Sequence, residues 1–240
     1  MPRLRSLVLR LAMAAQVAAA GAATAQVAPS ISLAEQMRTM LAKPAAGGGA
    51  APAAPVFSAA PAVTSASALA ALNAPLVANG PAQVRQSATE LAQRFPAAHR
   101  SAMTKAYEES FIFWQKLETQ LGLTPNDAAA GVAAFIAGNY TAFMQQAVPD
   151  ENFKSLVLQM QRMLAQNPAF MQSSPAAKRA MFEQLAMVGT FMVVYREHLN
   201  SKPNPNEEVN FRNAAKANLE AALGLGVERI QIGPQGLVAR

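Results

Sequence analysis

Eleven consecutive residues without a polar side chain run from Ala128 to Gly138, and Tyr140 and Phe143 continue the apolar character. A helix that is apolar on every face is normally buried, either in a protein core or in a membrane. Spanning a bilayer takes roughly 20 apolar residues, which is more than this run supplies. The run therefore predicts a buried central helix around which the other helices pack.

The residues before this run predict where the central helix begins. Thr124 is a candidate N-cap, Pro125 suits the first helical position, and Asp127 is an acidic residue near the positive end of the helix dipole. We therefore expect the central helix to cover about residues 125–146.

Small residues at helical spacing predict the closest neighbour of the central helix. They form a strip on one face and comprise Gly131, Ala134, Gly138 and Ala142. A second apolar run, Ala186 to Tyr195, contains Gly189, and a glycine inside a helix costs about 1 kcal/mol relative to alanine unless close packing compensates. We expect the helix of about 175–200 to pack against the strip.

Apolar residues at helical spacing continue through residues 82–226 and predict an all-α domain. The expected fold is a single bundle of five to six helices around the central helix. Residues 227–240 form a C-terminal tail that alternates briefly at Ile230 and Ile232, and we expect it to be too short to form a sheet.

The first 25 residues have the pattern of a secretory signal peptide of bacterial type. Arg3, Arg5 and Arg10 precede an apolar stretch, and Ala23-Thr24-Ala25 supplies the small residues that a signal peptidase requires. We expect cleavage between Ala25 and Gln26, which predicts a periplasmic or secreted protein. The sequence contains no cysteine for lipid attachment, disulfides or a thiolate site.

Residues 26–43 and 44–81 are expected to form two further segments. The first contains a short amphipathic helix with an apolar side made of Leu33, Met37, Met40 and Leu41. This helix either docks on the main domain or awaits a partner. Residues 44–81 are rich in Ala, Pro and Gly and hold no charged residue, which predicts a disordered linker.

Charge gives little support for a nucleic-acid partner. The formal net charge is +6, and removal of Arg3, Arg5 and Arg10 lowers it to +3 in the mature chain. No basic helix with interleaved aromatic residues is present. We therefore expect no nucleic-acid partner, and no transmembrane span in the mature chain.

Two acidic residues, Glu108 and Glu109, are the basis for an alternative function as a cell-envelope hydrolase. Glu109-Ser110 resembles the catalytic Glu-Ser of lytic transglycosylases, but the Gly-Leu-Met-Gln stretch that should follow is absent. The pair also sits inside a predicted helix, and the simpler interpretation of Glu108 and Glu109 is a solvated helix face. No catalytic set converges in the sequence, and we predict no enzyme activity.

Histidine and methionine raise the question of a metal site. His198 follows Glu197 near the end of a helix, where a cationic residue favours the negative end of the dipole. We predict no metal or cofactor there, and His198 is, with Glu108 and Glu109, a candidate to face a ligand or partner. Methionine pairs at Met37/Met40 and Met160/Met163 suggest a third function, a periplasmic Cu(I) binder. The same pairs lie on apolar stripes, where methionine is an adaptable core residue.

Asn139 interrupts the apolar surface of the central helix and is followed by Tyr140. A buried amide without partners costs about 1–3 kcal/mol, so Asn139 must find hydrogen bonds. It either fixes the register of neighbouring helices or, together with Tyr140, faces a ligand or partner.

The letters Asn126-Asp127-Ala128, Phe135-Ile136 and Asn139-Tyr140 resemble those of an uncharacterised family of exported bacterial helical proteins. The resemblance extends over about residues 82–240 and implies an exported helical domain, without assigned catalytic residues. The sequence thus favours an exported helical protein that binds an unknown protein partner or an apolar ligand.

Overall fold

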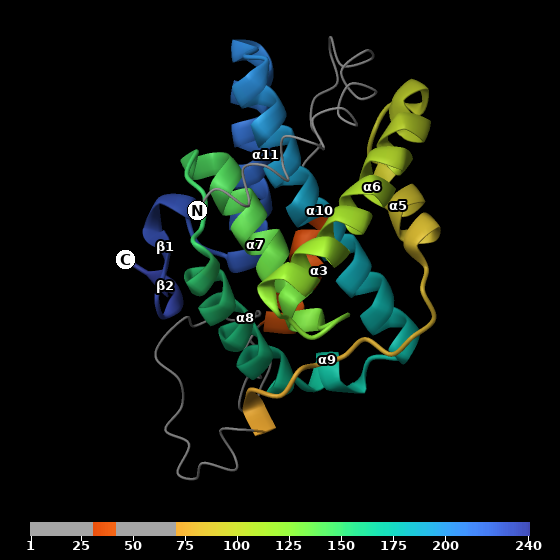
Figure 1. Ribbon diagram of the computed structural model, residues 1–240, viewed down its shortest axis with the longest axis vertical. Helices are drawn as coiled ribbons and strands as arrows, with labels where there is room; N and C mark the ends of the chain where they lie inside the picture. Colours follow the sequence, from red (N-terminus) through yellow and green to blue (C-terminus); the bar gives the residue numbers. More distant parts are fainter. Residues whose placement is uncertain (1–30, 42–70) are drawn as a thin grey trace, which may run out of the picture.

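The computed structural model describes residues 31–41 and 71–240, which form helices and one small sheet (Figure 1). The expected signal peptide and residues 44–70 of the expected linker lie outside these residues. The helices are α3 (Ile31–Leu41), α5 (Val84–Ala92), α6 (Ala97–Leu121), α7 (Ala128–Met144), α8 (Asp150–Ala165), α9 (Pro168–Gln172), α10 (Pro175–Ser201) and α11 (Pro205–Leu223). The all-α prediction is confirmed.

Helix α7 is the buried centre of the bundle. Every residue from Ala128 to Tyr140 is buried, and α7 packs against α8, α10 and α11 (Figure 1). Helix α6 packs on α10 through edge-to-face contacts such as Phe111 with Phe182, and α5 lies outside it. The uninterrupted apolar run therefore predicted the central helix correctly.

The predicted start of this helix at Pro125 is wrong. Asp127 is the N-cap, and its side chain accepts a hydrogen bond from the backbone N–H of Ala129. Asn126 adopts the left-handed conformation, with φ 62°, so Pro125 and Asn126 belong to a turn. The helix ends at Met144 because Gln145 is also left-handed, with φ 58°.

Three glycines allow α7 and α10 to approach closely, as the strip of small residues predicted. A Cβ atom added to Gly138 would collide with the backbone of Gly189, and one added to Gly189 would collide with the carbonyl group of Ala134. A Cβ on Gly131 would lie 2.9 Å from the Phe182 ring. The two backbones are thus in direct contact, which side chains would prevent.

Most helix ends follow the local sequence signals. Ser174 and Asn204 cap α10 and α11, each followed by proline, and Gly224 ends α11 in the left-handed conformation. Pro149 occupies the cap position of α8, and Asp150 is the first residue of this helix.

Residues 73–83, here called the strap, run in extended form across the bundle and lead into α5. Within the strap the backbone N–H of Ala78 donates to the carbonyl of Asn126 (2.9 Å), and the carbonyl of Leu76 accepts from the N–H of Ala128 (3.0 Å). Residues 71–81, inside the range expected to be linker, therefore belong to the described structure.

The C-terminal tail forms a sheet, contrary to the prediction. Strands β1 (Ile230–Gly233) and β2 (Gly236–Ala239) pair antiparallel, with Ile232 opposite Leu237. The side-chain amide of Gln159 donates to the carbonyl of Leu237 (2.8 Å) and accepts from its N–H (2.7 Å). Gln159 thus replaces a neighbouring strand and anchors the hairpin to α8.

Helix α3 docks on the bundle against α8, α9 and α11. Leu33, Met37 and Leu41 are buried in the common core, whereas Glu35 and Gln36 are exposed. The side chain of Met40, assigned to the same apolar side, is outside the described part. Of the two alternatives for this helix, docking is the one the structure shows.

Candidate functional site

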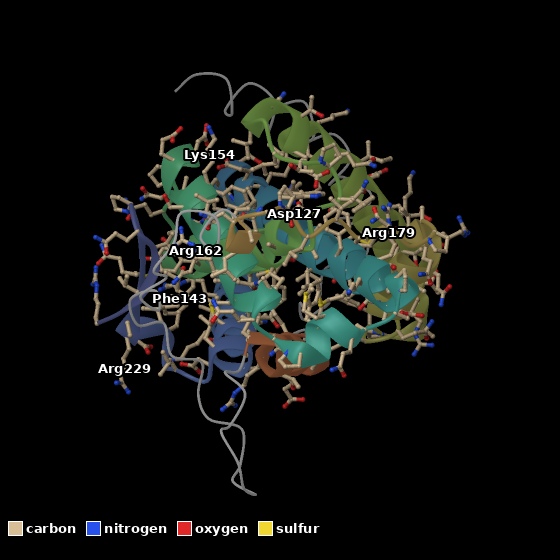
Figure 2. All side chains as sticks on the ribbon, turned by 90° about the horizontal axis from the view of Figure 1, so that it is seen from below. Asp127, Phe143, Lys154, Arg162, Arg179 and Arg229 are labelled. Carbon is tan, nitrogen blue, oxygen red and sulfur yellow. The ribbon has the colours of Figure 1, made fainter. Side chains whose placement is uncertain are left out.

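Asp127 is the centre of a buried polar cluster at the start of α7. One carboxylate oxygen accepts from the N–H of Leu76 (3.1 Å) and of Ala129 (3.0 Å), and the other accepts from the amide of Gln161 (2.6 Å). The residue is 1% exposed, and Figure 2 shows Asp127 near the middle of the molecule. A single side chain therefore joins the strap, α7 and α8. Burial raises the pKa of Asp127, and its three hydrogen bonds oppose that rise.

Glu118, in the last helical turn of α6, contacts the loop at Pro125 and Asn126 that precedes α7. Its carboxylate accepts from the backbone N–H of Asn126 (3.2 Å), and the residue is 3% exposed. Burial raises the pKa of Glu118 to about 7; the negative charge of Asp127 adds to the rise, while Arg179 and hydrogen bonding oppose it. Burial removes water from the Glu118 carboxylate and so disfavours its charged form. This effect is larger than the opposing effects of the hydrogen bonds and of Arg179.

Arg179 and Glu183 on α10 complete the cluster as a buried ion pair. The guanidinium of Arg179 donates to Glu183 (2.6 Å) and to the side-chain carbonyl of Asn126 (2.8 Å). Glu183 also accepts from the N–H of Gln83 (3.0 Å) and the hydroxyl of Ser87 (2.9 Å). This pair thereby fixes the end of the strap and the first turn of α5.

The described contacts of this cluster are made to backbone groups and to one another. Together they fix the strap to the turn before α7 at one end and to α10 at the other. The cluster therefore has a structural role: it holds in place the strap, a segment that has few apolar side chains of its own.

Asn139 is a residue of α7, and its side chain links this helix to α11. Its amide donates to the carbonyl of Phe135 (2.8 Å), and its oxygen accepts from the side-chain amide of Asn218 (2.8 Å). Tyr140 beside it is buried at 9% exposure. This geometry matches the register role considered for Asn139, and contact of either residue with a ligand or partner stays a prediction.

Glu108 and Glu109 lie on the outer part of α6, each near a basic side chain. Glu108 is 3.6 Å from Arg85, and Glu109 is 3.9 Å from Lys105. His198 is buried near the end of α10, with its ring 5.8 Å from the ring of Tyr195. Burial lowers the pKa of His198, Lys202 lowers it further, and Glu207 opposes both.

These placements leave the alternative functions as predictions. Across residues 31–41 and 71–240, His, Asp and Glu side chains do not gather in threes as a metal site would require. Met160 is buried in the core and Met37 is buried in α3, where packing accounts for both. The hydrolase and Cu(I) hypotheses are not tested by this geometry.

The second candidate site is the groove that α3 fills, where apolar side chains and one cation of α3 make the contacts. Its apolar floor accepts Leu33, Met37 and Leu41, and the guanidinium of Arg38 lies against Gly224, the C-cap of α11. A cation suits a helix C-terminus, which carries partial negative charge, although within the described residues Arg38 Nε is buried without a hydrogen-bond partner. At the other end, the side chain of Asn167 donates to the carbonyl of Thr39 (3.2 Å).

Comparison with known families places the whole chain. The model of DUF6683, a family of unknown function, matches residues 4–240. The chain belongs to this family. No curated protein and no solved structure gives a significant match. Membership in DUF6683 confirms that the resemblance pointed to an uncharacterised family, whereas bacterial origin and export stay predictions for this member. In the part of this DUF6683 chain that the structure describes, no helix combines the length and apolarity needed to cross a bilayer.

Sequence reasoning missed the polar cluster of this DUF6683 chain. Asp127 was identified only as a helix-start residue, and Gln161 was not identified as its partner. One signal was available: Arg179 and Glu183 are spaced i, i+4 on a helix that continues with the uncharged run from Ala186 to Tyr195. The partners of Asp127 are 51 and 34 residues away in the sequence, and no local pattern links them.

Proposed function

We propose that this chain is an exported, non-catalytic interaction protein that binds an amphipathic helix in the groove now filled by α3. The observation that carries the proposal is the docking of α3 by one face onto a groove lined by three other helices, with about 30 residues between it and the strap. An isolated helix of this length is marginal in water, so its helical state depends on the groove.

The groove specifies the chemistry of its occupant. Apolar side chains at positions i, i+4 and i+8 fill the floor, as Leu33, Met37 and Leu41 do, and a cation at i+5 meets the end of α11, as Arg38 does. Recognition of a helix through such anchors is a common mode of peptide binding. A partner helix with this pattern would compete with α3.

The strength of the competition between a partner helix and α3 depends on the chain segment that joins α3 to the strap. The composition of residues 44–81 predicts a flexible connection, which would give the attached helix an effective concentration in the millimolar range, so we expect a free helix to bind the intact protein weakly. Cutting the chain between Lys43 and Ala71 removes this advantage.

The signal pattern of residues 1–25 supports the proposed export. Mature protein from the producing cells should begin at Gln26, and an intact Met1 would contradict export.

The test uses mature protein with a site-specific protease sequence inserted between Lys43 and Ala71. After cleavage, a fluorescent peptide of residues 29–43 should exchange into the groove, and its affinity should exceed that for the uncut protein by at least about tenfold, as the loss of the tethered competitor requires. A peptide carrying Met37→Asp is the matched control and should not bind. Failure of the cut protein to release α3, or its unfolding on release, would overturn the proposal.

A further inference from the structure

Asn79 and Gly80 are the one asparagine in the sequence that precedes a glycine and that glycine, and both lie in the strap. An asparagine loses ammonia when the backbone nitrogen of the next residue attacks its side-chain amide. Glycine favours this attack because it has no Cβ beside the nitrogen and its backbone is conformationally permissive. Asn79 is exposed, so water reaches its amide.

No hydrogen bond to residues 31–41 or 71–240 holds either reacting group of this pair. Within these residues the side-chain amide of Asn79 has no partner, and the N–H of Gly80 has no acceptor. In the described part of the chain, the two groups that must meet are therefore not engaged by other contacts.

The other asparagines lack such a nitrogen. Proline follows Asn167 and Asn204, and proline has no N–H. The N–H groups that follow Asn73 and Asn126 donate to backbone carbonyls. The remaining asparagines lie in helices, which fix the nitrogen of the next residue: Asn139, Asn152, Asn200, Asn206, Asn210, Asn213 and Asn218. Asn79 is therefore the asparagine of this chain that is best placed to react.

The strap is fixed on both sides of this pair. On one side the N–H of Ala78 donates to the turn before α7 (2.9 Å), and on the other the N–H of Gln83 donates to Glu183 (3.0 Å). Between these two anchors Gly80 passes the first turn of α10 on the way to α5 (Figure 1), so closely that a Cβ would collide with the carbonyl group of Pro175. The backbone has no room here for added atoms.

We propose that Asn79 deamidates spontaneously and that the isoaspartate formed there releases the strap from the bundle. The Gly80 nitrogen gives its proton to water and bonds to the side-chain carbonyl carbon of Asn79. The bond from this carbon to the amide nitrogen breaks, and ammonia leaves with a proton taken from water. Water then opens the cyclic imide at either carbonyl, which gives aspartate or isoaspartate.

The two products differ in their effect on the strap. In isoaspartate the chain runs through the former side chain, which adds one carbon atom, or roughly 1.5 Å, between the two anchors. Because Gly80 fits against Pro175 without spare room, the strap must give up an anchor. Aspartate adds a charge at an exposed position but no backbone atom, so it leaves the strap in place.

The anchors also set the rate of the reaction. Ring closure turns the peptide plane between Asn79 and Gly80, and the close contact of Gly80 with α10 allows this only when the strap opens locally. A variant that weakens one anchor should therefore react faster, while a peptide of residues 74–85, which has no anchors, should react fastest.

Mass spectrometry of the full mature protein, aged in neutral buffer and then digested, tests the site. Asn79 should show the mass shift of deamidation before any other asparagine does. Gln83→Ala removes the side-chain hydrogen bond to the carbonyl of Ala176 and should speed the conversion roughly two- to tenfold, the factor that one hydrogen bond contributes. Gln86→Ala removes a hydrogen bond within α5 and is the matched control, with an unchanged rate.

Amide hydrogen exchange of the deamidated fraction, isolated by its extra negative charge, tests the release. In the share that contains isoaspartate, the Ala78 or the Gln83 amide should exchange at close to its intrinsic rate. Asn79→Asp carries the charge without the added carbon, so both amides should stay protected in this variant. Earlier conversion of another asparagine, equal rates in Gln83→Ala and the unaltered protein, or full protection of both amides in the isoaspartate form would overturn the proposal.

Discussion

Gly189→Ala is expected to lower the free energy of unfolding by about 3 kcal/mol or more. Overpacked core positions typically cost about 1–3 kcal/mol, and here the new methyl group meets the carbonyl of Ala134, which is backbone and cannot rotate away. The gain in helix propensity, about 1 kcal/mol, does not offset the separation of α7 from α10. Urea denaturation of the mature protein measures the change.

Gly233→Ala is the matched control for this substitution. A Cβ at Gly233 would meet nothing within 4 Å, and the residue has no positive φ. Its stability should therefore change by less than about 0.5 kcal/mol. A similar small effect of Gly189→Ala would mean that the α7–α10 contact does not determine the core.

Arg179→Met is expected to lower the free energy of unfolding by about 3–5 kcal/mol. The substitution leaves Glu183 buried and charged without its cation, which is the most costly way to break a buried pair. Adding Glu183→Gln removes that charge and keeps an acceptor for Gln83, so the double variant should recover at least half of the loss. Denaturant titration of the single and double variants gives both values.

Lys105→Met provides the control for a loss of charge alone. Lys105 is exposed and its partner Glu109 is partly buried, 3.9 Å away, and such surface pairs contribute at most about 1 kcal/mol. A comparable cost for Lys105→Met and Arg179→Met would contradict the view that the buried cluster clamps the strap.

The central helix and its closest neighbour could be predicted from the sequence, whereas the strap and the C-terminal hairpin could not. The run from Ala128 to Gly138 predicts a buried helix, and the glycines at 138 and 189 leave room for another backbone to approach closely. Helix starts at Ser174 and Asn204 were also readable, because cap and proline signals act over four residues. These features are local or depend on composition alone.

The clamp and the hairpin depend on contacts between distant residues, and local patterns do not report those. The strap has the composition of a linker and is ordered by hydrogen bonds to Asn126, Asp127 and Glu183, not by its own apolar side chains. The tail forms a hairpin because Gln159, far away in sequence, supplies the hydrogen bonds of a neighbouring strand. Of the candidate sites, only the α3 residues were recognisable in advance, from amphipathic spacing.

The most direct measurement of the central claim compares amide hydrogen exchange in α3 with that in α7 in the uncut mature protein. If α3 is a releasable occupant of its groove, its amides should exchange through an opening at least about 2 kcal/mol below the global unfolding that exposes α7, because locally opening units have lower free energies than the core. Exchange of α3 and α7 with the same free energy would show instead that α3 is a permanent part of the core, and would contradict a helix-binding groove.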